Sequence, residues 1–226
     1  MTRIIMVRHG QSIANAQGRF AGHSDFDLTD LGRQQAECAA VYMRRKGIIP
    51  DAIYSSDLKR AHNTALPISK EFGLPINDTK HLREIFAGSW ESMTVDEISE
   101  KYRDAFLTWK TDFSNARCTD GESVCELYDR IVPFVCELAA ANDEKTLVLT
   151  THATPVRAID CFSRTWNVER IGEVSFVRNS AISIFNYENG VISPERVDIV
   201  DHLDPSLITG VHHNLNGTNK KQNSKV

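Results

Sequence analysis

The chain opens with a stretch that decides how it folds, Ile4-Ile5-Met6-Val7-Arg8-His9-Gly10. Its first four residues form a continuous apolar run, which is typical of a buried strand. A later stretch has the same design, since Thr146-Leu147-Val148-Leu149-Thr150 leads into Thr151-His152-Ala153. Open α/β sheets bind ligands at the carboxyl ends of their strands. Two histidines at such ends, one of them beside an arginine, predict a pocket that grips and attacks a phosphoryl group.

Strand-like and helix-like stretches alternate along the chain, which predicts βαβ units and a largely parallel sheet. We therefore expect an α/β fold, a three-layer sandwich with helices on both faces of the sheet. The predicted strands are residues 3–7, 52–55 and 145–151, the predicted helices are 29–46, 57–72, 121–141 and 155–164, and 181–187 with 191–199 form a hairpin about Glu188-Asn189-Gly190.

Several local signals refine this prediction. Ser56 and Asp57 are expected to cap the helix that follows, and Pro67 inside it argues against a straight helix. Thr94 is expected to begin another helix, with Glu97 completing a capping box. We expect a single domain over residues 1–204 with a helical lid at about 92–120, followed by a polar and loosely held tail at 205–226.

Composition limits the classes of function. The 226 residues are 41% hydrophobic and 25% charged, so a folded core is expected, and the net charge of −4 predicts no general attraction to nucleic acid or membranes. The five scattered cysteines form no Cys-x-x-Cys pair, so we expect free thiols and no zinc site. With neither a leader nor a long apolar span, the chain is predicted to be soluble and cytoplasmic. A homodimer, paired through the 181–199 hairpin, is left open.

The first stretch supplies groups suited to phosphoryl transfer. A neutral His9 imidazole is a competent nucleophile, and the Arg8 guanidinium presents a planar fork that matches phosphate oxygens. Gly10 is expected to let the backbone approach the ligand closely. A helix that begins near Ser12 is expected to aim its free N–H groups at the same anion.

Further polar groups follow other predicted strands. Asn15 lies one helical turn beyond Gln11, and Arg60 lies one turn into the helix after the second strand. Glu84 follows a short extended piece that we expect within residues 76–92. Each of these has an ordinary structural explanation when it is taken alone. Together with His152 they bring the residue types that phosphoryl transfer needs to one edge of the predicted sheet.

The chain resembles the histidine phosphatase superfamily, whose members include the cofactor-dependent phosphoglycerate mutases. The resemblance covers residues 3–158, about two-thirds of the chain. It rests on Val7-Arg8-His9-Gly10-Gln11-Ser12-x-x-Asn15, Gly18-Arg19-Phe20-x-Gly22, Leu28-Thr29-x-x-Gly32-x-x-Gln35-Ala36, Ser55-Ser56-Asp57-Leu58-x-Arg60-Ala61-x-x-Thr64-Ala65, Leu82-Arg83-Glu84-x-x-x-Gly88-x-Trp90-Glu91 and His152. The chain departs from the family pattern at Ala153, where relatives usually have glycine.

The resemblance implies a role for each matching residue. His9 corresponds to the nucleophile that becomes phosphohistidine, and Glu84 to the acid that protonates the leaving oxygen. Arg8, Arg60 and His152 correspond to the phosphate-binding cluster. The implied substrate-binding set also includes Gln11, Asn15, Gly22 and Ala153. No metal is implied, because arginines and a protonated histidine supply the positive charge.

The expected activity is metal-independent hydrolysis of a small phosphorylated metabolite without a cofactor. The alternative is a phosphoglycerate mutase that uses 2,3-bisphosphoglycerate. The mutase branch typically carries Arg-His-Tyr after the acid, whereas Glu84 is followed by Ile85-Phe86-Ala87 here. A non-catalytic phosphate-binding protein is a third hypothesis. An apolar wall for the leaving group is expected from among Phe20, Phe26, Phe86, Trp90, Phe106 and Trp109.

Overall fold

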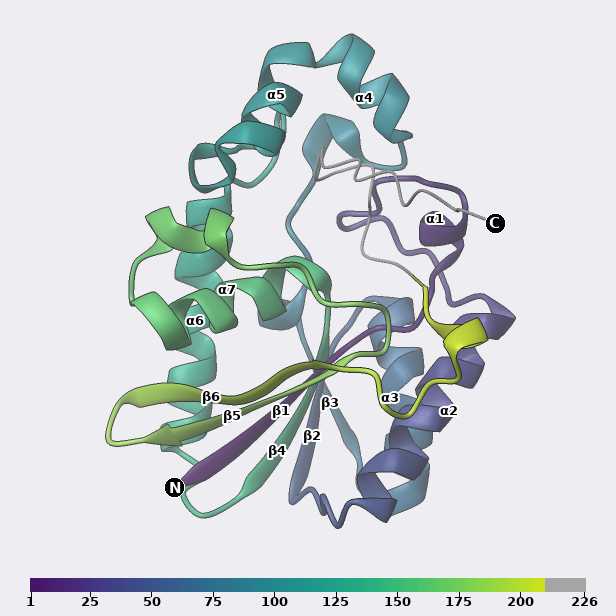
Figure 1. The fold of residues 1–226 in the computed structure, drawn as a ribbon, viewed down its shortest axis with the longest axis vertical. Helices are drawn as coiled ribbons and strands as arrows, with labels where there is room; N and C mark the ends of the chain where they lie inside the picture. The colour runs from purple at the N-terminus through teal and green to yellow at the C-terminus, as the bar shows by residue number, and fades with distance from the viewer. Residues whose placement is uncertain (210–226) are drawn as a thin grey trace, which may run out of the picture.

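A computed structural model describes residues 1–209 of the chain (Figure 1). Its six-stranded sheet has the order β3-β2-β4-β1-β5-β6. The strands are β1 (Thr2–Arg8), β2 (Ala52–Ser56), β3 (Ile76–Thr79), β4 (Thr146–Thr151), β5 (Ile182–Glu188) and β6 (Val191–Ile199). The α-helices are α1 (Ile13–Ala16), α2 (Asp30–Arg45), α3 (Lys59–Phe72), α4 (Val95–Lys101), α5 (Arg103–Thr111), α6 (Val124–Ala140) and α7 (Ala153–Thr165).

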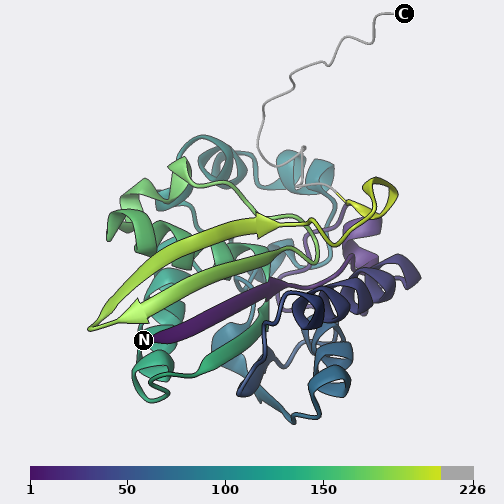
Figure 2. The same ribbon diagram turned by 60° about the horizontal axis from the view of Figure 1, so that its bottom comes forward.

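The central strand β1 shows why the molecule has three layers. Ile4 and Met6 belong to an apolar cluster with residues of α6 and α7, whereas Ile5 and Val7 belong to a second cluster with residues of α2 and α3. Since successive side chains of a strand point to opposite faces, the unbroken apolar run feeds both clusters. Figure 2 shows helices on the two sides of the sheet. The predicted α/β sandwich is confirmed.

Strand register brings the two histidines together. β1 and β4 are parallel neighbours, with Arg8 opposite Thr151, so His9 and His152 each follow a paired residue at the same edge. β2 and β3 are also parallel and end at this edge. β5 is antiparallel to β1, so β5 begins at the edge where β1 ends. The sheet is therefore parallel over β3-β2-β4-β1 and antiparallel at β5 and β6.

Helices α4 and α5 stand beyond the carboxyl ends of the strands (Figure 1), and we call this pair the lid. The capping box of Thr94 and Glu97 is present at the start of α4, as expected. The lid is held by aromatic packing, since Trp109 of α5 contacts Phe20 edge-on at 5.3 Å between ring centroids and Trp90 at 5.7 Å. This packing joins the lid to the segment that follows α1 and to the 3₁₀ turn at Trp90.

The start of α3 corrects one prediction. Neither Ser56 nor Asp57 is the cap residue, which is Leu58, and no side chain among residues 1–209 caps the helix. The two polar side chains have other partners, because Asp57 accepts two hydrogen bonds of 2.6 Å from Arg83 and Ser56 contacts His152. The helix also continues through Pro67 to Phe72, with its apolar face buried against the sheet.

Gly10 has a different role from the one expected. A Cβ atom placed on Gly10 would lie 2.3 Å from the carbonyl oxygen of Gly32, and one on Gly32 would lie 2.1 Å from that of Gln11. The two glycines therefore allow the loop after β1 to pack directly on the first turn of α2. The expectation that Gly10 serves close approach to a ligand was wrong, because its open side faces protein backbone.

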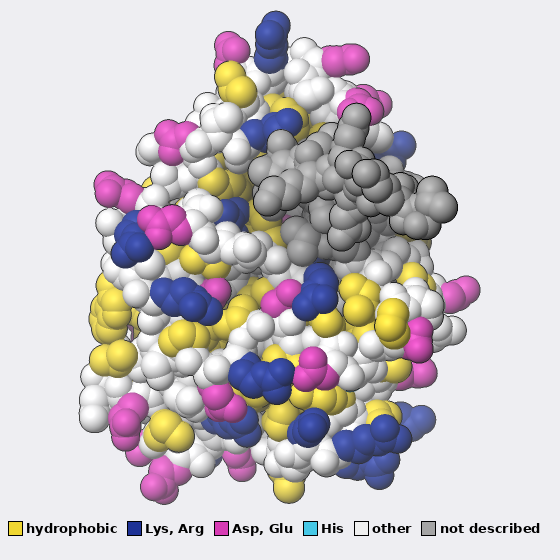
Figure 3. Space-filling model, in the orientation of Figure 1, with side chains coloured by type: hydrophobic (Ala, Val, Ile, Leu, Met, Phe, Trp, Pro, Cys, Tyr) yellow, Lys and Arg dark blue, Asp and Glu magenta, His cyan; other side chains and the backbone are white. Residues whose placement is uncertain are grey.

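The remaining regions bear on other expectations. All five cysteines are free thiols, as predicted. The hairpin of β5 and β6 turns at Asn189 and Gly190, both with positive φ. Of the predicted loose tail, residues 205–207 form a 3₁₀ turn and Leu207 accepts a hydrogen bond from Gln35, while residues 210–226 lie outside the described part. On the face in Figure 3, outside the grey atoms, Lys and Arg are interspersed with Asp and Glu.

Candidate active site

His9 is held in the tautomer that a nucleophile needs. Its Nδ1 lies 2.7 Å from the carbonyl oxygen of Gly10, and the ring is almost fully buried. Because a carbonyl oxygen only accepts, Nδ1 must carry the proton of the neutral ring, and Nε2 is then the unprotonated nitrogen. The backbone of His9 is fixed by a 2.9 Å bond to Thr151 of the neighbouring strand. The local fold thus selects the basic nitrogen.

His152 lies directly beside His9, with 5.1 Å between the ring centroids. Its Nδ1 accepts a hydrogen bond from Nε of Arg60 at 3.2 Å, so Nε2 carries the proton and donates it to Ser56 Oγ at 2.8 Å. Burial, followed by the positive charge of Arg60, holds the pKa of His152 well below its usual value. Both features favour the neutral imidazole, and the protonated histidine that the resemblance implies stays a prediction.

Two buried arginines supply the positive charge of the site. Arg60 is fully buried and donates to the carbonyl oxygens of Gly22 at 2.7 Å and Ser24 at 2.9 Å. Arg8 is 2% exposed and donates to the carbonyl oxygen of Val177 at 2.5 Å. Burial lowers the pKa of each guanidinium to about 10, so both stay charged at neutral pH. Arg8 Nε has no hydrogen-bond partner within the described residues, which suits a site that receives an anion.

Glu84 faces the same pocket from the loop after β3. One carboxylate oxygen accepts from the backbone N–H of Ile85 at 2.9 Å, and the other lies 3.4 Å from the N–H of Thr154 in the first turn of α7. The backbone carbonyl of Glu84 accepts from His23 Nε2 at 2.9 Å and from Arg130 at 3.3 Å. The acid is therefore held at both its side chain and its backbone.

The pocket brings together most of the residues that the sequence singled out. Its lining includes the predicted residues Arg8, His9, Asn15, Gly22, Arg60, Glu84 and Ala153. His152 lies behind this lining, against His9 and Arg60. Gln11 does not line the pocket, because its side-chain oxygen accepts a 2.9 Å hydrogen bond from Thr29.

The helix at Ser12 does not present the amides that were expected. α1 has only four residues, and the N–H of Ser12 donates to the Asn15 side chain at 3.1 Å. The N–H of Ile13 donates to the Asp27 carbonyl, and that of Asn15 to the Ser12 hydroxyl. These amides are used within the protein, so that prediction was wrong. The helix that begins at the pocket is instead α7, whose first residues Ala153 and Thr154 line it.

One supporting residue was missed. Asn179 is 2% exposed and donates to the carbonyl oxygen of His9 at 3.1 Å and to the side-chain oxygen of Asn15 at 3.2 Å. It immediately precedes the hairpin whose first strand is antiparallel to β1. That topology would have placed Asn179 at the catalytic edge, but the sequence pattern did not reveal which neighbour the hairpin pairs with.

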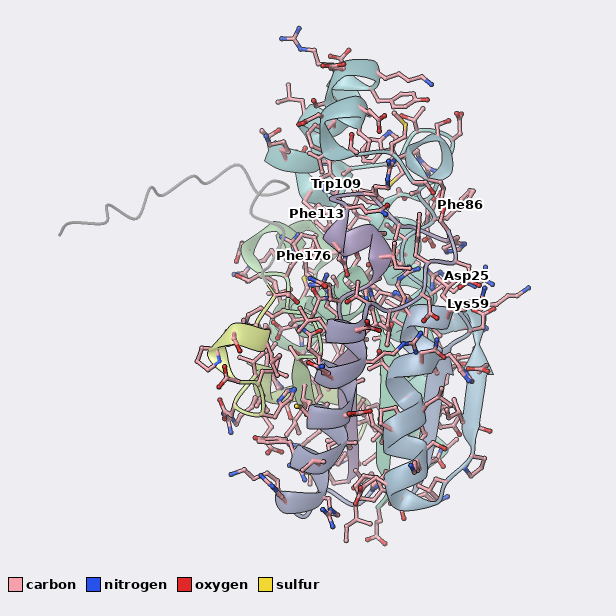
Figure 4. The ribbon with its side chains drawn as sticks, turned by 90° about the vertical axis from the view of Figure 1, so that its right-hand side faces the viewer. Asp25, Lys59, Phe86, Trp109, Phe113 and Phe176 are labelled. Atoms are coloured by element: carbon pink, nitrogen blue, oxygen red, sulfur yellow. The ribbon has the colours of Figure 1, made fainter. Side chains whose placement is uncertain are left out.

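Part of the pocket lining is apolar. Phe20, Val95, Trp109 and Phe176 form this part, and the wall continues as Trp109, Phe113 and Phe176 follow one another from the lid toward the sheet (Figure 4). Of the other aromatic candidates, Trp90 and Phe106 are buried in the core, whereas Phe86 is 42% exposed and Phe26 does not line the pocket. Arg19 adds a third arginine to the lining.

The described residues also bear on metal binding and membrane insertion. Within residues 1–209, no three His, Cys, Asp or Glu side chains are grouped so that they could hold a metal ion. The described helices include none with the length and apolar character needed to cross a membrane.

Comparison with known proteins identifies the family. The model of the histidine phosphatase superfamily, branch 1, matches residues 4–199, so the chain belongs to this superfamily. It is 35% identical over 161 residues to phosphoserine phosphatase 1 of Hydrogenobacter thermophilus, covering 71% of this chain and 75% of the relative. It is 33% identical over 161 residues to a metal-independent phosphoserine phosphatase of Arabidopsis thaliana, covering 70% and 67%.

A solved structure agrees with this assignment. The mycobacterial glucosyl-3-phosphoglycerate phosphatase in complex with VO3 superposes with a TM-score of 0.79 at 29% identity, over 87% of this chain and 98% of that one. The predicted family, fold and phosphatase class are thereby confirmed. The role of each site residue stays a prediction.

Proposed function

We propose that the chain is a metal-independent phosphomonoester hydrolase that works through a phosphohistidine at His9. The observation that carries this proposal is the convergence on one pocket of His9, in its Nδ1–H tautomer, with two buried arginines and a carboxylate. Phosphoryl transfer needs little more than a positioned nucleophile, a proton donor and positive charge around the phosphoryl oxygens.

In the first step, the unprotonated Nε2 of His9 attacks phosphorus and the bond from phosphorus to the ester oxygen breaks. Arg8 and Arg60 stabilise the negative charge that spreads over the phosphoryl oxygens. Glu84, protonated at this stage, gives its proton to the leaving oxygen, so an alcohol departs. The products of this step are an alcohol, phosphohistidine and the Glu84 carboxylate.

In the second step, water attacks the phosphohistidine from the side that the alcohol has left. The Glu84 carboxylate takes one proton from this water, and the bond from phosphorus to Nε2 breaks. Inorganic phosphate forms, while His9 and Glu84 return to their starting states. The two arginines provide the charge that a metal ion supplies in other phosphatases, so no cofactor is required.

The leaving group is proposed to be small and anionic. Arg19 lines the pocket, as do Trp109 and Val95, and its Nε and Nη1 are held by Gln17 at 3.2 Å and the Ser92 carbonyl at 2.6 Å. A guanidinium fixed in this way can pair with a carboxylate on the departing alcohol. The names of the similar enzymes, which act on phosphoserine and glucosyl-3-phosphoglycerate, support a phosphate ester that carries a carboxylate.

The proposal is tested by trapping the intermediate. Protein treated with EDTA is mixed with ³²P-labelled phosphoserine or phosphoglycerate, quenched in alkali and digested. We expect release of inorganic phosphate without added metal and an acid-labile label on His9. His9→Gln should lose the label and at least about 10⁴-fold of the turnover, whereas His62→Gln, on the surface of α3, should keep both.

Other outcomes would support the alternatives. Rapid isomerisation of 3-phosphoglycerate with 2,3-bisphosphoglycerate, with little phosphate released, would indicate a mutase. Phosphate binding without label or turnover on any ester would indicate a binding protein.

A further inference from the structure

Arg60 depends on a short loop for its position. Its Nη2 and Nη1 donate to the carbonyl oxygens of Gly22 and Ser24, at 2.7 and 2.9 Å. Its Nε donates to His152, so all three of its nitrogens have protein partners. Because two of these partners are backbone atoms of residues 22–24, the place of the guanidinium in the pocket follows the conformation of that loop.

The carboxylate of Glu91 holds this loop. One oxygen accepts from the N–H of His23 at 2.7 Å and from the N–H of Ala87 at 3.1 Å. The other accepts from the N–H of Ser24 at 2.6 Å and from its hydroxyl at 2.5 Å. The loop therefore directs N–H groups toward Glu91 and carbonyl groups toward Arg60.

Glycine at position 22 is needed for this arrangement. Gly22 has a φ of +48°, and a Cβ there would lie 2.3 Å from the Glu91 carboxylate and 2.5 Å from the Ala87 side chain. The loop thus packs closely against Glu91 at Gly22, in addition to the hydrogen bonds that it makes through His23 and Ser24. Glu91 itself does not line the pocket, so its effect on a bound phosphoryl group must pass through other residues.

Glu91 also contributes charge. Arg60 is completely buried, which disfavours its positive charge, and the negative charges of Glu84 and Glu91 both oppose that effect. Removing the Glu91 charge would leave the loop N–H groups with poorer acceptors and the guanidinium with less compensation. Both consequences disfavour the position and the charge of Arg60 that the pocket needs.

We propose that Glu91 is a positioning residue that sets Arg60 in the phosphoryl pocket through the loop of residues 22–24. The proposal deepens the proposed function, since it rests on the same phosphoryl site. Glu91 acts on the bound group through Arg60 and makes no contact with the substrate.

The test is a double-mutant cycle of Glu91→Gln with Arg60→Ala. It is measured as kcat/KM on a phosphomonoester and as the Kd for inorganic phosphate. In the Glu91→Gln variant an amide NH₂ replaces one acceptor of the loop, and a misplaced arginine should lower kcat/KM by up to about 100-fold. Phosphate affinity should fall in parallel. In the Arg60→Ala background, the same Glu91→Gln change should cost less than about threefold, because the residue it positions is gone.

A matched control separates positioning from a general loss of a carboxylate. Glu126 also accepts a backbone N–H, that of Ser123 in the capping box of α6, but it does not line the pocket. Glu126→Gln should stay within about twofold of the wild type. If Glu91→Gln does not fold, Ser24→Ala serves instead, since it removes only the hydroxyl donor to Glu91 and should weaken phosphate binding by a few fold.

Equal losses from Glu91→Gln with and without Arg60 would overturn the proposal, as would wild-type phosphate affinity in Glu91→Gln. The phosphate arm does not depend on turnover. An inactive wild type would therefore contradict the proposed hydrolysis while leaving the cycle on phosphate affinity intact.

Discussion

The pocket has two sides that are built in different ways. The floor consists of Arg8, His9, Arg60 and Glu84, together with His152 directly behind them. These residues lie at or just after strand ends and are fixed by hydrogen bonds. The roof consists of Phe20, Val95, Trp109 and Phe176, which come from a loop, the lid and the segment before β5 and are held by apolar and ring-edge contacts. Hydrogen bonds are directional and hold side-chain atoms in one geometry, whereas apolar contacts tolerate replacement by other apolar side chains of similar size. Changes in the floor should therefore affect every substrate, and changes in the roof should alter preference among substrates.

Among the changes that compare the two sides, the largest effect is expected from the floor, with Glu84→Gln. The amide cannot donate a proton to the leaving oxygen or accept one from water, so turnover of alkyl phosphates should fall by about 10²–10⁴-fold. An activated ester such as p-nitrophenyl phosphate needs little help in its first step, so its phosphohistidine should form and accumulate. Rapid-quench measurement of bound label checks this. Equal losses in the labelling step for both esters would contradict the role as acid.

The floor was also the part that the sequence predicted best. The apolar runs before His9 and His152 predicted that the two histidines lie at the same edge of the sheet, because parallel neighbouring strands end at the same edge. Glu84 and Arg60 followed from their places after strands. The supporting contacts were not predictable in this way. Asn179 reaches His9 only because β5 is antiparallel to β1, and that pairing is a tertiary choice.

Local signals misled where a tertiary contact competed with them. Ser56 resembles a helix cap in the sequence, but its hydroxyl is hydrogen-bonded to His152, which follows the neighbouring strand β4. Gly10 looks like a ligand-approach residue, but α2 packs against it. That burial beside Arg60 lowers the pKa of His152 could be known only from the fold. In each case the missing information was which segment lies next to the residue.

A smaller and selective effect is expected on the roof side of the pocket, with Arg19→Gln. An ion pair to a substrate carboxylate is worth about 1.5–3 kcal/mol, so kcat/KM on phosphoserine should fall by roughly 10- to 100-fold. Phosphoethanolamine has the same ester without the carboxylate, and its kcat/KM should change little. The ratio of the two values for wild type and variant measures the selectivity directly. A parallel loss on both substrates would place Arg19 with the floor.

The smallest effect concerns stability and pH, and it again separates floor from roof. His152 is neutral in the folded floor because its pKa is lowered by burial and by Arg60, whereas the unfolded chain takes up a proton on this residue below about pH 6.5. Below that pH the unfolded state therefore binds more protons, and the free energy of unfolding falls by about 1.4 kcal/mol per pH unit for this group. Burial likewise lowers the pKa of His202 to about 4, so His202 adds to the same acid sensitivity. The four roof residues Phe20, Val95, Trp109 and Phe176 do not titrate and should add nothing.

Urea unfolding between pH 7.5 and 5.5 measures this dependence. The slope of the free energy of unfolding against pH should be shallower for His152→Asn than for the wild type. Bound phosphate, whose negative charge favours protonated His152, should also flatten the wild-type slope. Identical slopes for wild type and His152→Asn would mean that His152 takes up a proton as readily in the folded protein as in the unfolded chain, which would contradict a lowered pKa.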